Sequence, residues 1–238
     1  LTSNDLSEEA QCGSAYGAER LNSRVTKAHA EELLSGAKQL GIEIDPARQD
    51  KLLAYLELLI KWNKAYNLTA VRDPDEMISR HLLDSLSVVS FVAEGGENWL
   101  DVGSGGGMPG IPLAIMCPEK TFKLLDSNGK KTRFLFHARC QLKLQNLTEI
   151  QSRVEQFQPE QTYDMVLSRA FTSVAEMVDK CKHLLNPDGR FLAMKGKFPQ
   201  SELSLLEKDY KVDVSHRLTV PGVEGERHLI EISKADIA

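Results

Sequence analysis

The part of this sequence best suited to chemistry is a glycine-rich segment. One acidic residue lies within it, and another ends the apolar run that follows it. The segment reads LDVGSGGGMPG over residues 100–110 and follows a short apolar run. Glycines at such a place allow a sharp turn and let a ligand contact the backbone at the carboxyl edge of a sheet. Asp126 ends the next apolar run, where a carboxylate can accept hydrogen bonds from both hydroxyls of a ribose. The segment therefore predicts a nucleoside-binding loop.

Two classes of cofactor share such a loop. Gly105, Gly107 and Gly110 match the dinucleotide pattern G-x-G-x-x-G, which is a weak signal by itself. Asp101 favours S-adenosylmethionine, because a carboxylate at the strand end suits its positively charged methionyl end and would repel a pyrophosphate. Asp126 does not discriminate, since an acidic residue there also serves NAD. We therefore favour S-adenosylmethionine and keep an NAD-dependent oxidoreductase as the alternative.

The elements that position this loop follow from the alternation of apolar runs and helical patterns. Strands are predicted at 99–102, 122–126, 147–151, 165–168 and 190–194, and helices after Pro109, at 130–142, and from Ser173 to a turn at 186–189. This alternation is typical of a parallel sheet. Two more strands, 212–218 and 228–232, follow without an intervening helix and flank a turn at 221–225, which predicts an antiparallel hairpin. We expect an α/β fold with a Rossmann-like, mostly parallel seven-stranded sheet.

A helical unit precedes this region. Apolar periodicity predicts a helix over 31–40, Asp45 and Pro46 open a second, and Asp73 and Pro74 open a third that runs through about residue 92. We divide the chain into a disordered tail over 1–29, a helical N-terminal extension over 30–95 and a catalytic domain over 96–238.

Composition bounds the function. The 238 residues carry a formal net charge of -5, which argues against a broadly basic nucleic-acid coat but allows a local basic patch. The four cysteines are scattered without metal-ligand spacing, so we expect cytosolic thiols and no metal. No run approaches the roughly 20 apolar residues that span a bilayer. We expect a cytoplasmic protein without a membrane segment, and a monomer by default.

Several segments in one order, from about residue 30 to 234, resemble the bacterial small-subunit ribosomal RNA guanine-N7 methyltransferase family, also named glucose-inhibited division protein B. They are KWNKAYNLT at 61–69, RHLLDS at 80–85, LDVGSGGGMPGIP at 100–112, LLDS at 124–127, QSRVE at 151–155, SRA at 168–170 and MKGK at 194–197. The resemblance implies a class I methyltransferase that uses S-adenosylmethionine. Its partner would be small-subunit ribosomal RNA, met within the small ribosomal subunit.

The same resemblance implies which residues contact the cofactor. The family's contacts fall on Gly103, Met108, Val154, Glu155 and Arg169, and the general class I positions are Gly105 and Asp126. Core packing is the simpler interpretation of Val154 alone. The stretch 105–108 reads GGGM, whereas GPGL is commoner in the family. We expect this difference to affect the stiffness of the loop and not its chemistry.

Guanine N7 presents a lone pair at neutral pH, so its methylation needs no general base and we predict no catalytic triad. Orientation of the base alone can contribute roughly 7 to 11 kcal/mol. Residues 167–170 read LSRA, unlike the Asn/Asp-Pro-Pro-aromatic signature of enzymes that methylate exocyclic amines. The candidates for holding RNA through its phosphates are the basic residues expected near strand ends, which are Lys130, Arg153, Arg169, Lys195 and Lys197.

Arg169 and Lys195 are also candidates for positioning the base, as are His81 and Asp84, which share one helix face. A hydrogen-bond network that docks the extension is an equally good role for that pair. Trp62 could stack on a base, as could Tyr66, but core packing is favoured for both. A non-catalytic RNA-binding assembly factor is a further alternative, although it predicts a broken cofactor loop and this loop is intact.

Overall fold

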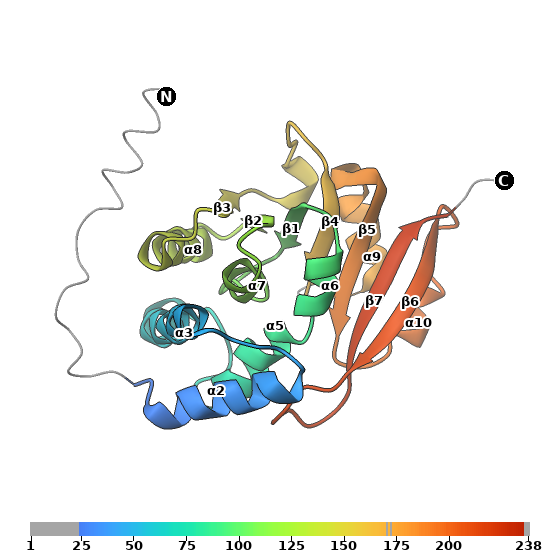
Figure 1. Cartoon of the computed structure of the whole chain (residues 1–238). Helices are drawn as coiled ribbons and strands as arrows, with labels where there is room; N and C mark the ends of the chain where they lie inside the picture. Colours follow the sequence, from blue (N-terminus) through green and yellow to red (C-terminus); the bar gives the residue numbers. More distant parts are fainter. Residues whose placement is uncertain (1–23, 170, 172, 236–238) are drawn as a thin grey trace, which may run out of the picture.

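The computed structural model describes residues 24–169, 171 and 173–235 (Figure 1). A seven-stranded sheet of order β3-β2-β1-β4-β5-β7-β6 forms its centre. The strands are β1 (Asn98–Val102), β2 (Thr121–Asp126), β3 (Leu147–Gln151), β4 (Tyr163–Ser168), β5 (Leu185–Lys195), β6 (Tyr210–Leu218) and β7 (Arg227–Lys234). β1 to β5 pair in parallel, and β7 pairs antiparallel with both β5 and β6. The predicted mostly parallel sheet with an antiparallel hairpin is confirmed.

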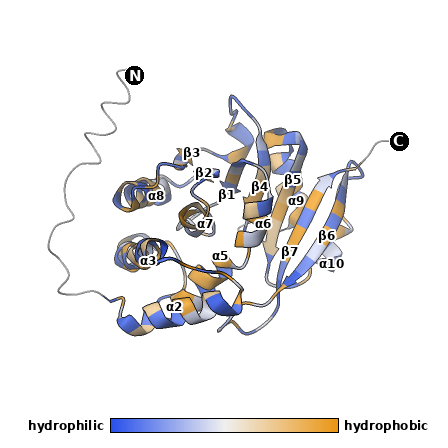
Figure 2. Ribbon diagram, in the orientation of Figure 1, coloured by the Kyte–Doolittle hydropathy of each residue, from blue (hydrophilic) through white to orange (hydrophobic). Residues whose placement is uncertain are grey.

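Helices cover both faces of this sheet, and each face has its own hydrophobic cluster. α7 (Gly110–Met116) and α8 (Gly129–Leu142) pack on the face that buries Trp99 and Phe122, while α9 (Val174–Cys181) packs on the face that buries Phe191. Apolar and polar residues alternate in bands along β6 and β7 (Figure 2). The strand order reverses between β1 and β4, which is the place where α/β sheets bind ligands.

The N-terminal extension consists of α2 (Lys27–Gln39), α3 (Pro46–Tyr66), α4 (Pro74–Met77), the π-helical η2 (Ile78–Leu83), α5 (Asp84–Leu86) and α6 (Val89–Glu94). Asp45 caps α3 as predicted, since its carboxylate accepts a hydrogen bond from the Arg48 N–H at 2.9 Å. Residues of α3 and η2 share the cluster of Trp99 and Phe122. The extension thus packs into the sheet's core, and the domain boundary near residue 95 stays a prediction.

Two boundaries in the extension differ from the predicted ones. α2 begins at Lys27, inside the predicted tail, because the Thr26 N–H donates to His29 Nδ1 at 2.8 Å and fixes the first turn. The predicted third helix is a series of short helices, since the π-helical turn shifts the hydrogen bonds at 78–83 and Val88 leaves the helical conformation. The rest of the predicted tail, with Cys12, lies outside the described residues apart from 24–26.

Two further differences lie in the second half of the chain. α9 ends at Cys181 and is followed by η4 (Lys182–Leu184). The turn predicted at 186–189 lies instead within β5, between Leu185 and Arg190, which both pair with β4. Pro187 in this stretch has no N–H to donate to a strand neighbour. A short helix, α10 (Gln200–Leu203), intervenes between β5 and β6 where none was predicted, because four residues are too few to show helical periodicity.

Within the described part of the chain, no helix is both long and apolar enough to cross a membrane. The same residues contain no group of three His, Cys, Asp or Glu side chains placed to hold a metal ion.

Candidate functional site

The glycine-rich loop leaves β1 and is fastened to the end of β2. The N–H groups of Gly103 and Ser104 donate to the Leu125 carbonyl at 2.8 and 3.2 Å, and the Gly105 N–H donates to Asp126 Oδ2 at 2.9 Å. Gly105 has φ +58°, a conformation that side chains with a Cβ rarely adopt. The loop conformation therefore depends on one carboxylate and on the absence of a side chain.

Asp126 is buried, and both of its carboxylate oxygens are engaged once. Oδ2 accepts a hydrogen bond from the Gly105 N–H, and Oδ1 accepts one from the Asn128 N–H at 2.8 Å. Lys131 Nζ lies 3.7 Å from Oδ2. A carboxylate oxygen can accept two hydrogen bonds. Asp126 thus fixes the loop and still has the capacity to accept from two ligand hydroxyls.

Asp101 lies beneath the same loop rather than beside an opening. Its Oδ2 accepts from the Gly110 N–H at 3.0 Å, while Oδ1 is buried without a partner among the described residues. Burial raises the pKa of this carboxyl to about 7. A Cβ on Gly110 would lie 2.8 Å from Oδ2, so only glycine fits there. Asp101 holds the start of α7.

Tyr55 of α3 reaches the loop from the extension. Its side chain is fully buried, its hydroxyl donates to the Gly106 carbonyl at 2.6 Å, and burial raises its pKa. Leu59 and Leu68 also pack against Gly106. The extension therefore supports the loop at Gly106, the position where the family that the sequence resembles more often has a proline. Sequence reasoning missed Tyr55, although a hydroxyl within an apolar helical stripe needs a buried partner.

A cavity of about 310 Å³, which we call the loop cavity, opens beside these groups. Its lining includes four of the eight predicted cofactor residues, which are Gly103, Asp126, Val154 and Glu155. Val154 and Phe171 contribute apolar surface and are half-buried against the second hydrophobic cluster. Gly105 and Met108 belong to the glycine-rich loop but do not line this cavity, and Arg169 lines a different one.

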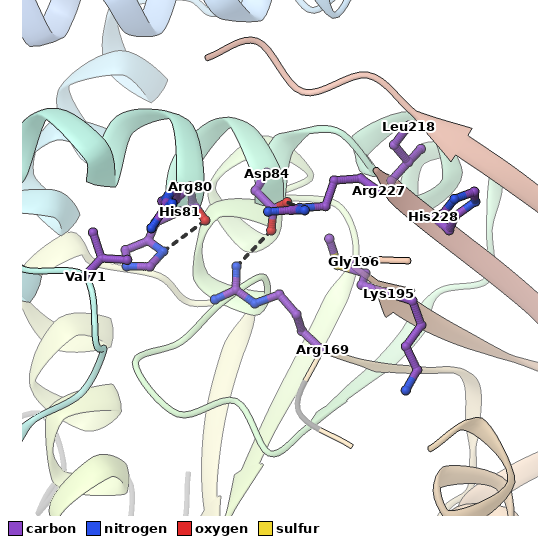
Figure 3. Close-up of a pocket in the computed structure, with 11 residues that line it drawn as sticks. Val71, Arg80, His81, Asp84, Arg169, Lys195, Gly196, Leu218, Arg227 and His228 are labelled. Atoms are coloured by element: carbon purple, nitrogen blue, oxygen red, sulfur yellow. Dashed lines mark hydrogen bonds and ion pairs between the residues drawn. The ribbon is translucent and has the colours of Figure 1, made fainter. Parts of the chain in front are cut away.

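A second cavity, of about 450 Å³, lies between the extension and the strands β5 and β7 (Figure 3). We call it the basic cavity, because its charged lining residues are four cations and one carboxylate: Arg80, Arg169, Lys195, Arg227 and Asp84. Sequence reasoning missed Arg80 and Arg227. Only the fold brings them beside Arg169, since they come from the extension and the last strand.

Asp84 joins three segments at this cavity. Its Oδ2 lies 2.9 Å from Arg169 Nη1 and its Oδ1 lies 3.0 Å from Arg227 Nε, and both guanidinium groups turn toward it (Figure 3). The Arg169 guanidinium also lies 3.6 Å from Met108 Sδ of the glycine-rich loop. Arg169 thus lines the basic cavity and also contacts the glycine-rich loop, and Phe171, two residues further on, lines the loop cavity. The docking network that we weighed for Asp84 is present, and the same residue lines the basic cavity.

His81 is held in its neutral form. Nδ1 donates to the Arg80 carbonyl at 3.0 Å, an acceptor that has no proton, so Nε2 is left to accept from the Thr69 hydroxyl at 2.8 Å. Burial, and next the charge of Arg169, lower the pKa of His81 to about 4. At neutral pH the ring therefore carries no charge, and its one free lone pair is occupied.

We expect this burial to make stability depend on pH through His81. Its folded pKa lies below the unfolded value of 6.5, so the stabilisation is present above pH 6.5 and is lost as pH falls toward 4. At about pH 4.5 the loss should reach about 2.5 kcal/mol relative to His81→Gln. Urea unfolding of both proteins between about pH 4.5 and 7.5 measures it. A constant difference across that range would contradict the assignment of a neutral ring.

The predicted RNA-binding residues do not form one cluster. Lys195 lines the basic cavity, but its ammonium points away from Asp84 and binds Glu202 at 2.8 Å (Figure 3). Arg153 lines the loop cavity, and Lys130 and Lys197 are exposed outside both cavities. Of the predicted stacking residues, Trp62 packs on Tyr66 at 5.1 Å and on Phe134 at 5.6 Å, which is the favoured core role.

Comparison with known proteins shows what this chain is similar to. The family model GidB, described as rRNA small subunit methyltransferase G, matches residues 48–230. A Ribosomal RNA small subunit methyltransferase G from Ectopseudomonas mendocina (strain ymp) is 63% identical over 211 residues, covering 89% of this chain and 99% of that protein. The protein of the same name from Pseudomonas aeruginosa (strain UCBPP-PA14) is 60% identical over 208 residues, covering 87% and 97%.

Solved structures share the fold at low sequence identity. Magnesium protoporphyrin IX methyltransferase from Synechocystis PCC 6803 with bound SAM has a TM-score of 0.57 at 13% identity, covering 76% of this chain and 97% of that one. N-methyltransferase NodS from Bradyrhizobium japonicum WM9 in complex with S-adenosyl-l-homocysteine has a TM-score of 0.53 at 11% identity, covering 74% and 100%. The sheet with its terminal hairpin is thus an architecture found among methyltransferases.

Proposed function

This chain belongs to the rRNA small subunit methyltransferase G family, and on that premise we propose that it methylates N7 of one guanine in small-subunit ribosomal RNA. S-adenosylmethionine is the methyl donor. When bound, it supplies a methyl group on a sulfonium sulfur, and transfer to N7 leaves a thioether and a positively charged base. We assign the donor to the loop cavity and the guanine to the basic cavity.

The residues of the loop cavity fit an adenosyl ligand. Asp126 has the remaining hydrogen-bond capacity for both hydroxyls of a ribose. Val154 and Phe171 offer apolar surface to a base, and backbone at Gly103 is open to the cavity. Asp101 acts through the loop that it holds, because its carboxylate does not reach either cavity within the described residues. The single observation that carries the proposal is that Arg169 lines the basic cavity and at the same time contacts Met108 of the glycine-rich loop.

No general base is part of the proposed mechanism. Guanine N7 carries no proton at neutral pH, so the chain has only to orient the base. His81 has its free lone pair engaged by Thr69, and Asp84 is engaged by two guanidinium groups. Arg169 and Arg227 are instead suited to donate to O6 or a phosphate of the target nucleotide. The role left for these side chains is orientation, which can contribute roughly 7 to 11 kcal/mol.

The test is methyl transfer to small ribosomal subunits from a strain that lacks this modification. We expect labelled methyl from S-adenosylmethionine to appear at one guanine and to be recovered as N7-methylguanosine. Label on an exocyclic nitrogen, or none, would overturn the proposal. Calorimetric titration provides the independent check on the loop cavity. Tight binding of NAD without binding of S-adenosylmethionine would favour an oxidoreductase instead.

We further propose that a single copy of the chain meets its RNA in the cytoplasm, on the small subunit or a late precursor of it. The family name of the relatives at 60 to 63% identity supports the small-subunit RNA as substrate. Methylation rates on protein-free RNA and on subunits, measured at equal RNA concentration, separate the two forms of substrate. A faster reaction on protein-free RNA would contradict the assembled form.

A further inference from the structure

α3 and α8 lie side by side on one flank of the molecule and carry an unusual surplus of positive charge (Figure 1). α8 has four Lys and Arg residues and no acidic residue, and residues 58–72 also contain no acidic residue. The whole chain has a net charge of -5, so this surplus is local. A surplus of one sign in an acidic protein needs a separate explanation.

Four of these cations form a ridge, which we define as Lys61 and Lys64 of α3 with Lys130 and Arg133 of α8. All four are exposed. Lys130, Arg133 and His137 recur at helical spacing on one side of α8. His137 connects the two helices, because its ring lies 5.0 Å from that of Trp62, and burial and the nearby charge of Lys61 lower its pKa.

The ridge cations are not used by the fold. Among the described residues, none of the four lies within ion-pair distance of a carboxylate, whereas Lys180 and Lys182 on the other face each have two acidic partners. Lys130 also stands in the first turn of α8, where a cation is unfavourable because it lies at the positive end of the helix dipole. Stability therefore does not explain these residues, and binding of an anion would.

A fixed loop connects the ridge with the basic cavity. The Asn63 amide, one position before Lys64, accepts from the Thr69 N–H at 2.9 Å and donates to the Val71 carbonyl at 3.2 Å. Val71 lines the basic cavity. Arg72 adds one more cation along this path and donates to the Asn63 carbonyl at 3.2 Å. The end of α3 is thus joined to the cavity wall by a short, hydrogen-bonded segment.

From these observations we propose that the ridge binds the phosphate backbone of the RNA strand whose target guanine enters the basic cavity. The inference rests on the proposed function and extends it with a docking surface. Contact is electrostatic rather than by stacking, because Trp62 already packs on three rings, those of Tyr66, Phe134 and His137. Binding through phosphates is independent of base sequence and weakens steeply with salt.

The test uses the full chain with Lys61, Lys64 and Arg133 all replaced by alanine. A control replaces Lys27, Lys38 and Lys208, three exposed lysines away from the ridge, in the same way. We expect the ridge variant to bind a protein-free small-subunit RNA fragment about tenfold more weakly at 0.15 M salt, with a salt slope shallower by about 2. S-adenosylmethionine affinity and kcat at saturating RNA should stay at the level of the control.

Equal RNA affinity and salt slope in the ridge variant and the control would overturn the inference. So would a defect that appears with intact subunits but not with protein-free RNA, because the ridge would then dock an acidic ribosomal protein. Failure of the proposed function is distinguishable, since the unmodified chain would then form N7-methylguanosine in neither substrate. A loss of S-adenosylmethionine affinity in the ridge variant would also contradict the docking role.

Discussion

Replacing Arg169 with alanine is expected to lower kcat/KM for RNA methylation by roughly 10²- to 10³-fold, the loss usual for one preorganised donor at a reacting centre. Its guanidinium contacts Asp84 of the basic cavity at 2.9 Å and lies 3.6 Å from Met108 Sδ of the glycine-rich loop. Methyl incorporation at subsaturating RNA measures the loss. Arg169→Lys should restore only a part, because an ammonium cannot replace the planar guanidinium.

The matched control is Asp84→Asn, which removes the charge that Arg169 neutralises while keeping the shape of the side chain. If Arg169 acts only by fixing Asp84, both variants and the double variant should lose the same activity. We expect the Arg169 loss to be larger, with kcat lowered as well as kcat/KM. An Arg169→Ala enzyme within threefold of the unmodified one would remove this residue from the proposed site.

Replacing Asp126 with alanine is expected to weaken S-adenosylmethionine binding roughly 30- to 150-fold, about 2 to 3 kcal/mol, as for a lost hydrogen-bonded charge. The change removes the proposed ribose acceptor and also frees the Gly105 and Asn128 N–H groups. Asp126→Asn separates the two effects, because an amide oxygen can still accept from one of those groups. Calorimetric titration of each variant gives the affinity.

Lys197→Ala provides the comparison, since this side chain is exposed and lines neither cavity within the described residues. We expect its S-adenosylmethionine affinity to be nearly that of the unmodified chain and its RNA binding to be weaker, the more so at low salt. Equal losses of cofactor affinity in the Asp126 and Lys197 variants would contradict the roles assigned to both.

Local signals were sufficient for most of the fold. Each strand except β5 begins within two residues of its predicted start, and the caps Asp45 and Asp73 start their helices as predicted. The misplaced elements depend on contacts that local signals do not report. The π-helical turn at 78–83 packs against α2, and the early start of β5 depends on pairing of Leu185 with Tyr163.

The residues of the site also divide into those that the sequence was enough to predict and those that only the fold brings together. Asp126 was predicted from its place at a strand end, and Gly103, Val154 and Glu155 from the family resemblance; all four line one cavity. Arg227 could not be predicted, because it approaches Asp84 across 143 residues of sequence and only after β7 has inserted beside β5. Lys195 lies near the strand end as predicted, but its ammonium is paired with Glu202 of α10, a helix that was not predicted, rather than open to bind RNA.

The place of Arg227 in the chain has a consequence for how the enzyme matures during synthesis. Every residue that lines the loop cavity lies between 102 and 171, whereas the basic cavity also needs Leu218, Arg227 and His228. A nascent chain therefore contains every residue of the cavity proposed for the methyl donor before β7, which closes the cavity proposed for the acceptor, has left the ribosome. If the basic cavity holds the guanine as proposed, the ability to act on RNA comes only after β7 has emerged and paired with β5.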